Sequence, residues 1–155
     1  MDADAMKRYI DDAFDGVDSL DHLGDTFYFY DPEAIRERLH PFITLVTGDH
    51  YDTVSDLSRP GAYRINMGLT KATYVSMFGA PPKHRDEHGV LKTGVDYAAV
   101  DTLMPHPYYA SQYWVSVVSP GEATLDTVRT LLAEAYQFAT RKHRNQRARR
   151  DRSTA

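Results

Sequence analysis

Four strand-like stretches occupy the middle of the chain, at residues 26–30, 42–47, 62–68 and 113–118. Each carries β-branched or aromatic residues, which favour extended backbone. The regular alternation of strands and helices that is typical of a parallel sheet is missing. The spacing therefore predicts an α+β fold built on a single antiparallel sheet.

Amphipathic helices are predicted near both ends of the chain. In residues 5–17, apolar side chains recur at helical spacing: Met6, Ile10, Phe14 and Val17. Residues 119–122, Ser-Pro-Gly-Glu, have the form of a capping box, with a cap serine and a glutamate three positions later. They open a second apolar stripe, made by Leu125, Val128, Leu132, Ala135 and Ala139. Both stripes need burial, so we expect the helices to pack mainly on one face of the sheet.

Shorter helical segments are predicted between the strands. Asp31-Pro32-Glu33 has the composition of a helix start and predicts a short helix through Arg38. Thr70 is expected to cap a helix that Gly79 ends, and residues 101–104 are expected to form one helical turn. Residues 80–96 contain two prolines and two glycines and are expected to form a loop.

Alternation within the strands predicts which side chains share a face. In residues 62–68, the apolar side chains alternate with Arg64 and Asn66. In residues 26–30, Tyr28 is expected on the polar face with Arg64, because a tyrosine hydroxyl can reach water. The core under the terminal helices is then expected to hold Phe27, Phe42, Ile65 and Val115.

The composition is that of one ordinary globular domain. The chain has 155 residues, of which 42% are hydrophobic and 26% charged, and it has no cysteine. The missing cysteines exclude disulfides, thiolate metal sites and cysteine nucleophiles. No apolar run reaches the roughly 18 residues of a membrane span, and the first residues lack the basic and apolar regions of a signal peptide. We therefore expect a cytoplasmic protein with no membrane partner.

Charge is divided unequally along the chain. Residues 141–152 hold seven basic residues and one acid, a net charge of +6, so the rest carries −10 to give the total of −4. We expect a single domain at residues 1–143 and a disordered basic tail at residues 144–155. The tail has three alternative roles: a solvated end, a contact with an acidic protein surface, or a contact with nucleic acid. The residues for that last contact are Arg141, Lys142, Arg144, Arg147, Arg149 and Arg150.

Several signatures of catalysis are absent. The sequence contains neither of the glycine-rich nucleotide-binding motifs, G-x-G-x-x-G and G-x-x-x-x-G-K-[ST], and no G-x-S-x-G nucleophile motif. Residues 84–88 match the zinc-binding order H-x-x-E-H, but that motif works on a rigid helix and these residues lie in the predicted loop. Asp49, His50 and Asp52 are typical of turn chemistry after a strand. We therefore expect no metal and no cofactor.

The polar face of the sheet holds the candidate binding residues. Arg64 would bind a carboxylate or phosphate, and His106 would form a hydrogen bond to the ligand. Asn66 would fix an amide or hydroxyl, while Tyr28 and Trp114 would stack on an aromatic ligand. The alternative is structural, with Arg64 paired to an acid and Trp114 buried in the core.

Several segments resemble a family of small bacterial proteins of unknown function. The resemblance covers about residues 24–143. It rests on the segments Gly24-Asp25-Thr26-Phe27-Tyr28-Phe29-Tyr30, His40-Pro41-Phe42-Ile43-Thr44-Leu45-Val46-Thr47, Arg59-Pro60-Gly61-Ala62-Tyr63-Arg64-Ile65-Asn66, Leu103-Met104-Pro105-His106-Pro107 and Trp114-Val115. It implies no assigned activity.

A weaker similarity links Pro107-Tyr108, residues 113–117 and residues 131–136 to the MmcQ/YjbR group. This similarity implies a CyaY-like fold, with an antiparallel sheet and helices on one side. That group is often labelled DNA-binding, a label that transfers poorly to a chain with an acidic body. Neither similarity brings catalytic residues.

Together these features predict a small binding or accessory protein rather than an enzyme. It would recognise a small molecule or a protein partner through polar and aromatic residues of the sheet. One alternative is a nucleic-acid-binding protein that uses the basic tail. Another is a cofactor-free acid–base isomerase or cyclase that uses His40, Asp49, His50 or His106. The sequence leaves the oligomeric state open.

Overall fold

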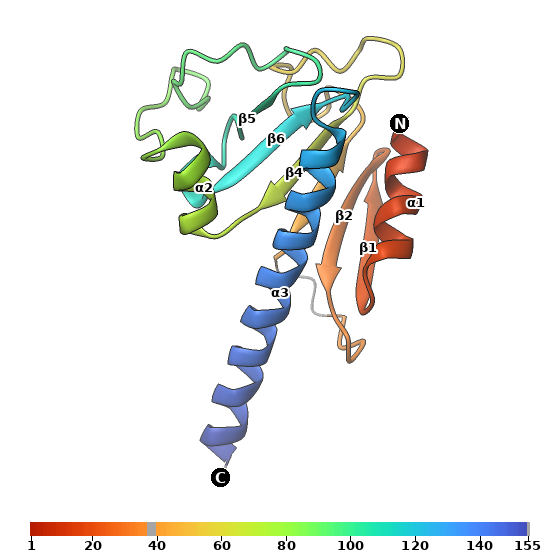
Figure 1. The fold of residues 1–155 in the computed structure, drawn as a ribbon, viewed down its shortest axis with the longest axis vertical. Coiled ribbons are helices and arrows are strands. Elements are labelled where there is room, and N and C mark those ends of the chain that lie inside the picture. Colours follow the sequence, from red (N-terminus) through yellow and green to blue (C-terminus); the bar gives the residue numbers. More distant parts are fainter. Residues whose placement is uncertain (37–39, 155) are drawn as a thin grey trace.

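The computed structural model of the protein describes residues 1–36 and 40–154. Its elements, in chain order, are α1 (Ala3–Ala13), β1 (Val17–His22), β2 (Asp25–Tyr30), β3 (Ile43–Val46), β4 (Arg64–Gly68), α2 (Lys71–Phe78), β5 (Leu103–Pro105), the short 3₁₀ helix η1 (Ala110–Gln112), β6 (Trp114–Val118) and α3 (Leu125–Thr154). The two long helices lie near the two ends of the chain, and the strands lie between them (Figure 1).

The strands form one antiparallel sheet in the order β1-β2-β3-β4-β6-β5. This confirms the predicted α+β class and the antiparallel pairing. β3 lies between β2 and β4, as its apolar side chains on both faces suggest. Only two residues join β1 to β2, which is possible because antiparallel neighbours need no crossover helix.

The hydrophobic core lies between the sheet and the two long helices. Met6 and Ile10 of α1 and Val128 and Leu132 of α3 are fully buried in it. The strands contribute Tyr28, Ile43, Leu45, Ile65, Met67, Val115 and Val117. The helices also contact each other, because the Arg129 guanidinium of α3 lies 5.5 Å from the ring centroid of Tyr9. The prediction that the helices cover mainly one face is confirmed.

The prediction of which β2 side chains point toward the helix-covered core is wrong. The register aligns Tyr28 with Ile43 and Met67 on the helix-covered face, and Phe27 with Thr44 and Asn66 on the other face. Every residue from 27 to 30 is aromatic, so alternation shows that neighbours differ in face but not which face is covered. Phe27 therefore does not join the core with Phe42, Ile65 and Val115.

The N-terminal helix is shorter than predicted, and a strand follows it. α1 ends at Ala13, and Gly16 turns the chain with a φ of +73°, a conformation that favours glycine. Val17 then opens β1, which pairs with β2 over six residues. β1 is an edge strand and most of its side chains are exposed, so it lacks the apolar alternation by which a strand is recognised.

The start of α3 is stabilised from a distance instead of by the predicted capping box. The Asp101 carboxylate accepts hydrogen bonds from the backbone N–H of Gly121 at 2.7 Å and from the hydroxyl of Thr124 at 2.6 Å. It also accepts from the backbone N–H groups of Ala123 and Thr124. These bonds, first that of the Thr124 hydroxyl, lower the pKa of Asp101 from 3.8 to about 2. Ser119 instead lies near the backbone N–H of Tyr63, at 3.4 Å.

Two short helices that the sequence predicts, at residues 31–38 and 101–104, do not form in the described residues. The residues around Asp101 do not form a helical turn, and β5 pairs with β6 there. In residues 31–36 the chain forms a turn, in which the Asp31 carboxylate accepts from the backbone N–H groups of Ile35 and Arg36. The rest of that segment, residues 37–39, lies outside the described residues. The helix after Thr70 is confirmed as α2, with the Thr70 hydroxyl accepting from the backbone N–H of Thr73.

The C-terminal segment is helical. α3 continues through residues 144–154, for which the sequence predicted disorder. Arginine, glutamine and alanine dominate this stretch and have high helix propensity, so the chain extends the helix that the core has already nucleated. Figure 1 shows this part of α3 running beyond the sheet and the other helices.

Candidate functional site

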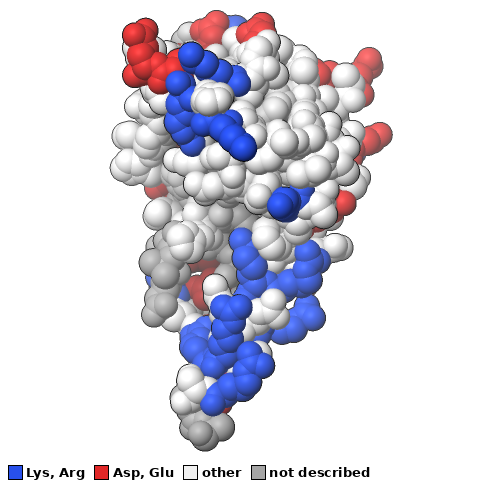
Figure 2. Space-filling model, turned by 90° about the vertical axis from the view of Figure 1, so that its left-hand side faces the viewer, with Lys and Arg blue, Asp and Glu red and all other residues white. Residues whose placement is uncertain are grey.

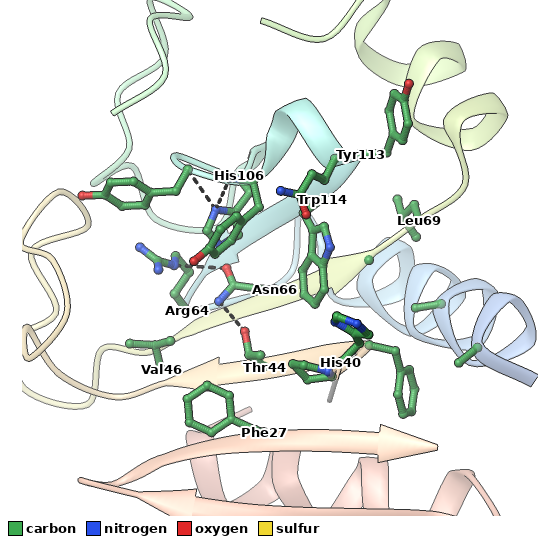
Figure 3. A pocket seen from close by; sticks show the side chains of 18 of the residues that line it. Phe27, His40, Thr44, Val46, Arg64, Asn66, Leu69, His106, Tyr113 and Trp114 are labelled. Atoms are coloured by element: carbon green, nitrogen blue, oxygen red, sulfur yellow. Dashed lines mark hydrogen bonds between the residues drawn. The ribbon is translucent and has the colours of Figure 1, made fainter. Parts of the chain in front are cut away.

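A cavity of about 710 Å³ lies against the sheet face that α1 leaves uncovered. Its floor comes from alternate residues of β3 and β4, among them Thr44, Arg64 and Asn66 (Figure 3). Residues of the β5–β6 region form one wall. The cavity also reaches α3, where Phe138 and Lys142 line it.

A row of polar side chains crosses the floor at one register position. Thr44, Asn66 and Ser116 are direct neighbours on β3, β4 and β6. The Asn66 amide donates to the Thr44 hydroxyl at 2.9 Å, and the Ser116 hydroxyl donates to the Asn66 carbonyl oxygen at 2.6 Å. Asn66 and Ser116 are buried, so these bonds offset the cost of taking their polar atoms out of water.

Arg64 extends this network and is buried as an ion pair. Its Nη1 and Nη2 donate to both carboxylate oxygens of Asp52, at 3.3 and 3.2 Å. Nη1 also donates to the Ser55 hydroxyl at 2.8 Å, and Nε donates to the Asn66 carbonyl oxygen at 3.1 Å. Only 3% of the residue is exposed. The bidentate contact with Asp52 neutralises the guanidinium. This matches the alternative in which Arg64 pairs with an acid of the protein.

His106 is buried beside Arg64 and is neutral. Its Nδ1 accepts from the backbone N–H groups of Tyr108 and Tyr109, at 3.0 and 3.1 Å. Burial, and after it the nearby Arg64 charge, hold the pKa of His106 well below its ordinary value of 6.5. An imidazole that accepts at Nδ1 carries its proton on Nε2, so this side chain offers the cavity a donor.

Aromatic rings form the walls of the cavity. The rings of Tyr109 and Trp114 lie 4.8 and 6.3 Å from the His106 ring, between centroids. The indole of Trp114 packs directly over Gly68 of β4. A Cβ atom at Gly68 would lie 2.9 Å from indole atoms Cε2 and Cζ2, so only glycine lets the indole approach this closely.

The structure brings together four of the five predicted ligand-binding residues. Arg64, Asn66, His106 and Trp114 all line the cavity. Tyr28 lies in the core on the opposite face, where burial raises the pKa of its hydroxyl.

Among the residues proposed for acid–base chemistry, His40 and His106 line the cavity, whereas Asp49 and His50 do not. Asp49 instead accepts from the backbone N–H of Leu57. Of the basic residues assigned to nucleic acid, Lys142 lines the cavity, and its ammonium lies 4.1 Å from the Phe138 ring centroid.

Sequence reasoning missed Thr44, Asp52 and Tyr109 as parts of this site. A threonine between two apolar residues of a central strand is a signal for Thr44. Nothing in the local pattern indicates that Asp52 reaches Arg64, because the residues lie in different elements and meet only after folding.

Residues 1–36 and 40–154 hold neither a metal-binding cluster nor a membrane-spanning helix. In this part of the chain, no group of three or more histidine or acidic side chains is arranged to hold a metal ion. No helix there has the length and apolarity to cross a membrane. His84 and His88 lie in a loop in which Asp86 accepts from the backbone N–H groups of His88 and Val90.

Comparison with known proteins gives a family without an assigned role. A family model described as a family of unknown function, DUF6194, matches residues 1–148, so the chain belongs to that family. No curated protein matches the chain, and no solved structure matches it either.

Proposed function

We propose that this member of DUF6194 binds a small, planar organic molecule that carries a hydrogen-bond acceptor. The observation behind the proposal is the donor balance of the cavity floor. A guanidinium has five N–H groups, and Arg64 uses four of them within the protein. Within the described residues, one N–H of Arg64, one N–H of Asn66 and Nε2–H of His106 have no protein acceptor.

Two acceptors at the centre of the floor, by contrast, are fully occupied. The Asn66 carbonyl oxygen receives two hydrogen bonds, and Nδ1 of His106 receives two. A ligand that faced this floor with donors would leave donors opposed to donors, which costs free energy in a buried site. A carbonyl oxygen or a ring nitrogen fits these N–H groups instead.

The charge of the floor favours an uncharged acceptor. Asp52 neutralises Arg64 at 3.2 Å, and His106 is neutral. Burying a carboxylate against the floor would require a cation that Asp52 already occupies, and the other lining cation, Lys142, lies against the Phe138 ring on α3 and not on the floor. The aromatic walls and the volume of about 710 Å³ suit a flat molecule, since ligand sites commonly span about 300 to 1,000 Å³.

Trp114 makes this proposal directly testable, because it is the only tryptophan and it lines the cavity. Titration with indanone, a flat ketone, is expected to change Trp114 fluorescence in a saturable way. Indane has the same shape without the carbonyl oxygen and is expected to bind more weakly. Equal binding of both compounds, or no saturable change with either, would contradict the proposal.

A matched pair of variants separates the cavity from the fold. Gly68→Ala is expected to push the indole of Trp114 into the cavity and abolish indanone binding. Gly48→Ala adds the same methyl group beside the exposed ring of His50, at 3.0 Å, where only a mobile side chain has to move. It is expected to bind indanone like the unaltered protein. Unchanged binding by Gly68→Ala would place the ligand elsewhere.

Two finer expectations from the sequence are proposed with this function. The similarity of Pro107-Tyr108, residues 113–117 and residues 131–136 to the MmcQ/YjbR group supports a CyaY-like fold. A crystal structure of this chain, superposed on a member of that group, would test the relation. We also propose that the protein acts in the cytoplasm, which fractionation of the cells that produce it would test.

A further inference from the structure

The C-terminal half of α3 is a basic projection that the cavity does not explain. α3 has 30 residues, about 45 Å of helix at 1.5 Å per residue. One face of the first half is buried in the core, whereas residues 144–153 are all exposed. Figure 2 shows Lys and Arg side chains gathered along this lower part of the molecule, and acidic side chains mainly on the body above it. We call residues 141–154 the basic projection.

The positive charges surround the helix on every side. At 3.6 residues per turn, Arg147 and Arg149 lie on nearly opposite sides, and so do Arg150 and Arg152. Between residues 141 and 153 the only apolar side chain is Ala148. A helix without an apolar face has nothing to insert into a lipid surface. A flat acidic protein surface would contact only one side of it.

From this distribution we propose that the basic projection binds double-stranded DNA by lying in the major groove. The groove is about 12 Å wide, and a helix with its side chains is about 10–12 Å across. Phosphates of both strands flank a helix in this position, so cations on opposite sides are both used. Asn145 and Gln146, in the middle of the projection, have the amide groups that pair with adenine edges.

The acidic body does not prevent this contact, because the projection holds it away. Beyond Arg147 the helix rises by about 10 Å to Thr154, and charges are screened over about 8 Å at physiological ionic strength. The first half of the projection is attached to the rest of the protein. Arg147 forms an ion pair with Glu33 at 3.0 Å, and Nε2 of His143 lies 3.9 Å from the same carboxylate.

The test compares full-length variants that lose the same charge from different places. One variant replaces arginines near the tip of the projection: Arg144→Gln, Arg149→Gln, Arg150→Gln and Arg152→Gln. Its matched control replaces four exposed cations of the body: Arg8→Gln, Lys71→Gln, Lys83→Gln and Lys92→Gln. Glutamine keeps a high helix propensity, so the first variant retains α3, which far-UV circular dichroism checks.

Binding to a fluorescein-labelled DNA duplex of mixed sequence is measured by anisotropy between about 50 and 200 mM salt. We expect the unaltered protein and the body variant to bind with a steep salt dependence. Each phosphate contact contributes about −0.9 to the slope of log K against log salt, so the projection variant should reduce the slope by about 3 to 4.

Four outcomes would overturn the proposal. The first is that the full chain binds no DNA duplex in low salt. The second is that the projection variant and the body variant lose affinity equally, which would indicate net charge alone. The third is that an RNA duplex or single-stranded DNA binds more tightly than the DNA duplex. The fourth is that the projection variant only abolishes self-association, as measured by sedimentation. None of these outcomes bears on the cavity, whose test uses indanone and Trp114.

Discussion

The two faces of the sheet share the same strands but have opposite chemistry. On β4, Ile65 and Met67 enter the apolar core under the helices, whereas Arg64 and Asn66 enter a hydrogen-bonded network on the other face. Both pairs are almost completely buried. The helix-covered face gains stability mainly from apolar area, at about 25 cal/mol per Å². The cavity face has to satisfy the geometry of each polar atom.

The difference between the faces is what the proposed function rests on. Replacing a buried ion pair by apolar residues of similar volume is often neutral or stabilising. The Arg64–Asp52 pair is therefore not what stability alone favours on this face. Its geometry and the donors left over beside it are what a binding site requires. The helix-covered face supports the fold, and under the proposed function the cavity face would exchange some stability for recognition of a ligand.

The largest effect is expected on the helix-covered face. Ile65→Ala removes a fully buried side chain from the centre of the core and should lower the free energy of unfolding by about 4 kcal/mol. Urea unfolding followed by circular dichroism measures this loss. Indanone should still bind to the folded fraction, because the side chain points away from the cavity. A loss below about 1 kcal/mol would mean that this face is not the main source of stability.

The next effect tests the ion pair of the cavity face. Asp52→Ala leaves the buried guanidinium of Arg64 without its carboxylate and should cost about 3 kcal/mol of unfolding free energy. The double variant Asp52→Ala, Arg64→Met has no unpaired charge and should recover part of that loss. Urea midpoints of the three proteins give the comparison. Equal stability of the single variant and the unaltered protein would show that Arg64 is solvated instead of paired.

A smaller effect is expected from the hydroxyl that orients Asn66. Ser116→Ala removes the 2.6 Å hydrogen bond to the Asn66 carbonyl oxygen, which still accepts from Arg64, and should cost about 1 kcal/mol. Ser58→Ala is the matched control, because it removes an exposed hydrogen bond to Asp56 and should change stability by less than about 0.5 kcal/mol. Thermal unfolding distinguishes the two, and a larger loss in the control would contradict the network.

The smallest effect concerns the link between the sheet edge and α3. The folded-state pKa of Asp101 is about 2, below its ordinary value of 3.8, so the folded protein binds this proton less readily than the unfolded chain. The stabilisation from this carboxylate is complete above pH 3.8 and is lost as the pH falls toward 2.

Asp101→Asn removes this titration. The stability difference between the unaltered protein and the variant should therefore shrink as the pH falls from 3.8 toward 2. Chemical unfolding at several pH values measures it. A difference that stays constant over this range would show that the cap does not depend on the carboxylate charge.

Local periodicity predicted much of the fold. The apolar stripes of α1 and α3, the alternation of β4 and the cap at Thr70 are properties of neighbouring residues, and all appear in the structure. β1 and β5 escaped prediction for opposite reasons. β1 is polar because it is an exposed edge, and β5 has only three residues. Such segments become strands through the partner they pair with.

The candidate site was also predicted only in part. Alternation grouped Arg64 with Asn66. His106 and Trp114, which were predicted for the same site, also line the cavity. Alternation could not place Tyr28, since residues 27–30 are all aromatic and have the same pattern whichever face is covered. It also proposed Arg64 as an anion anchor, a role that Asp52 now fills from within the protein.

The sequence by itself determined the amphipathic helices, the four apolar strands and where charge accumulates, because these depend on residues within a few positions of one another. Only the tertiary structure decided which face of β2 is buried, that Asp52 neutralises Arg64, and that Asp101 rather than Ser119 caps α3. Each of these depends on groups that are brought together when the strands pair and the helices pack. Their partners are chosen by three-dimensional register, which no local pattern encodes.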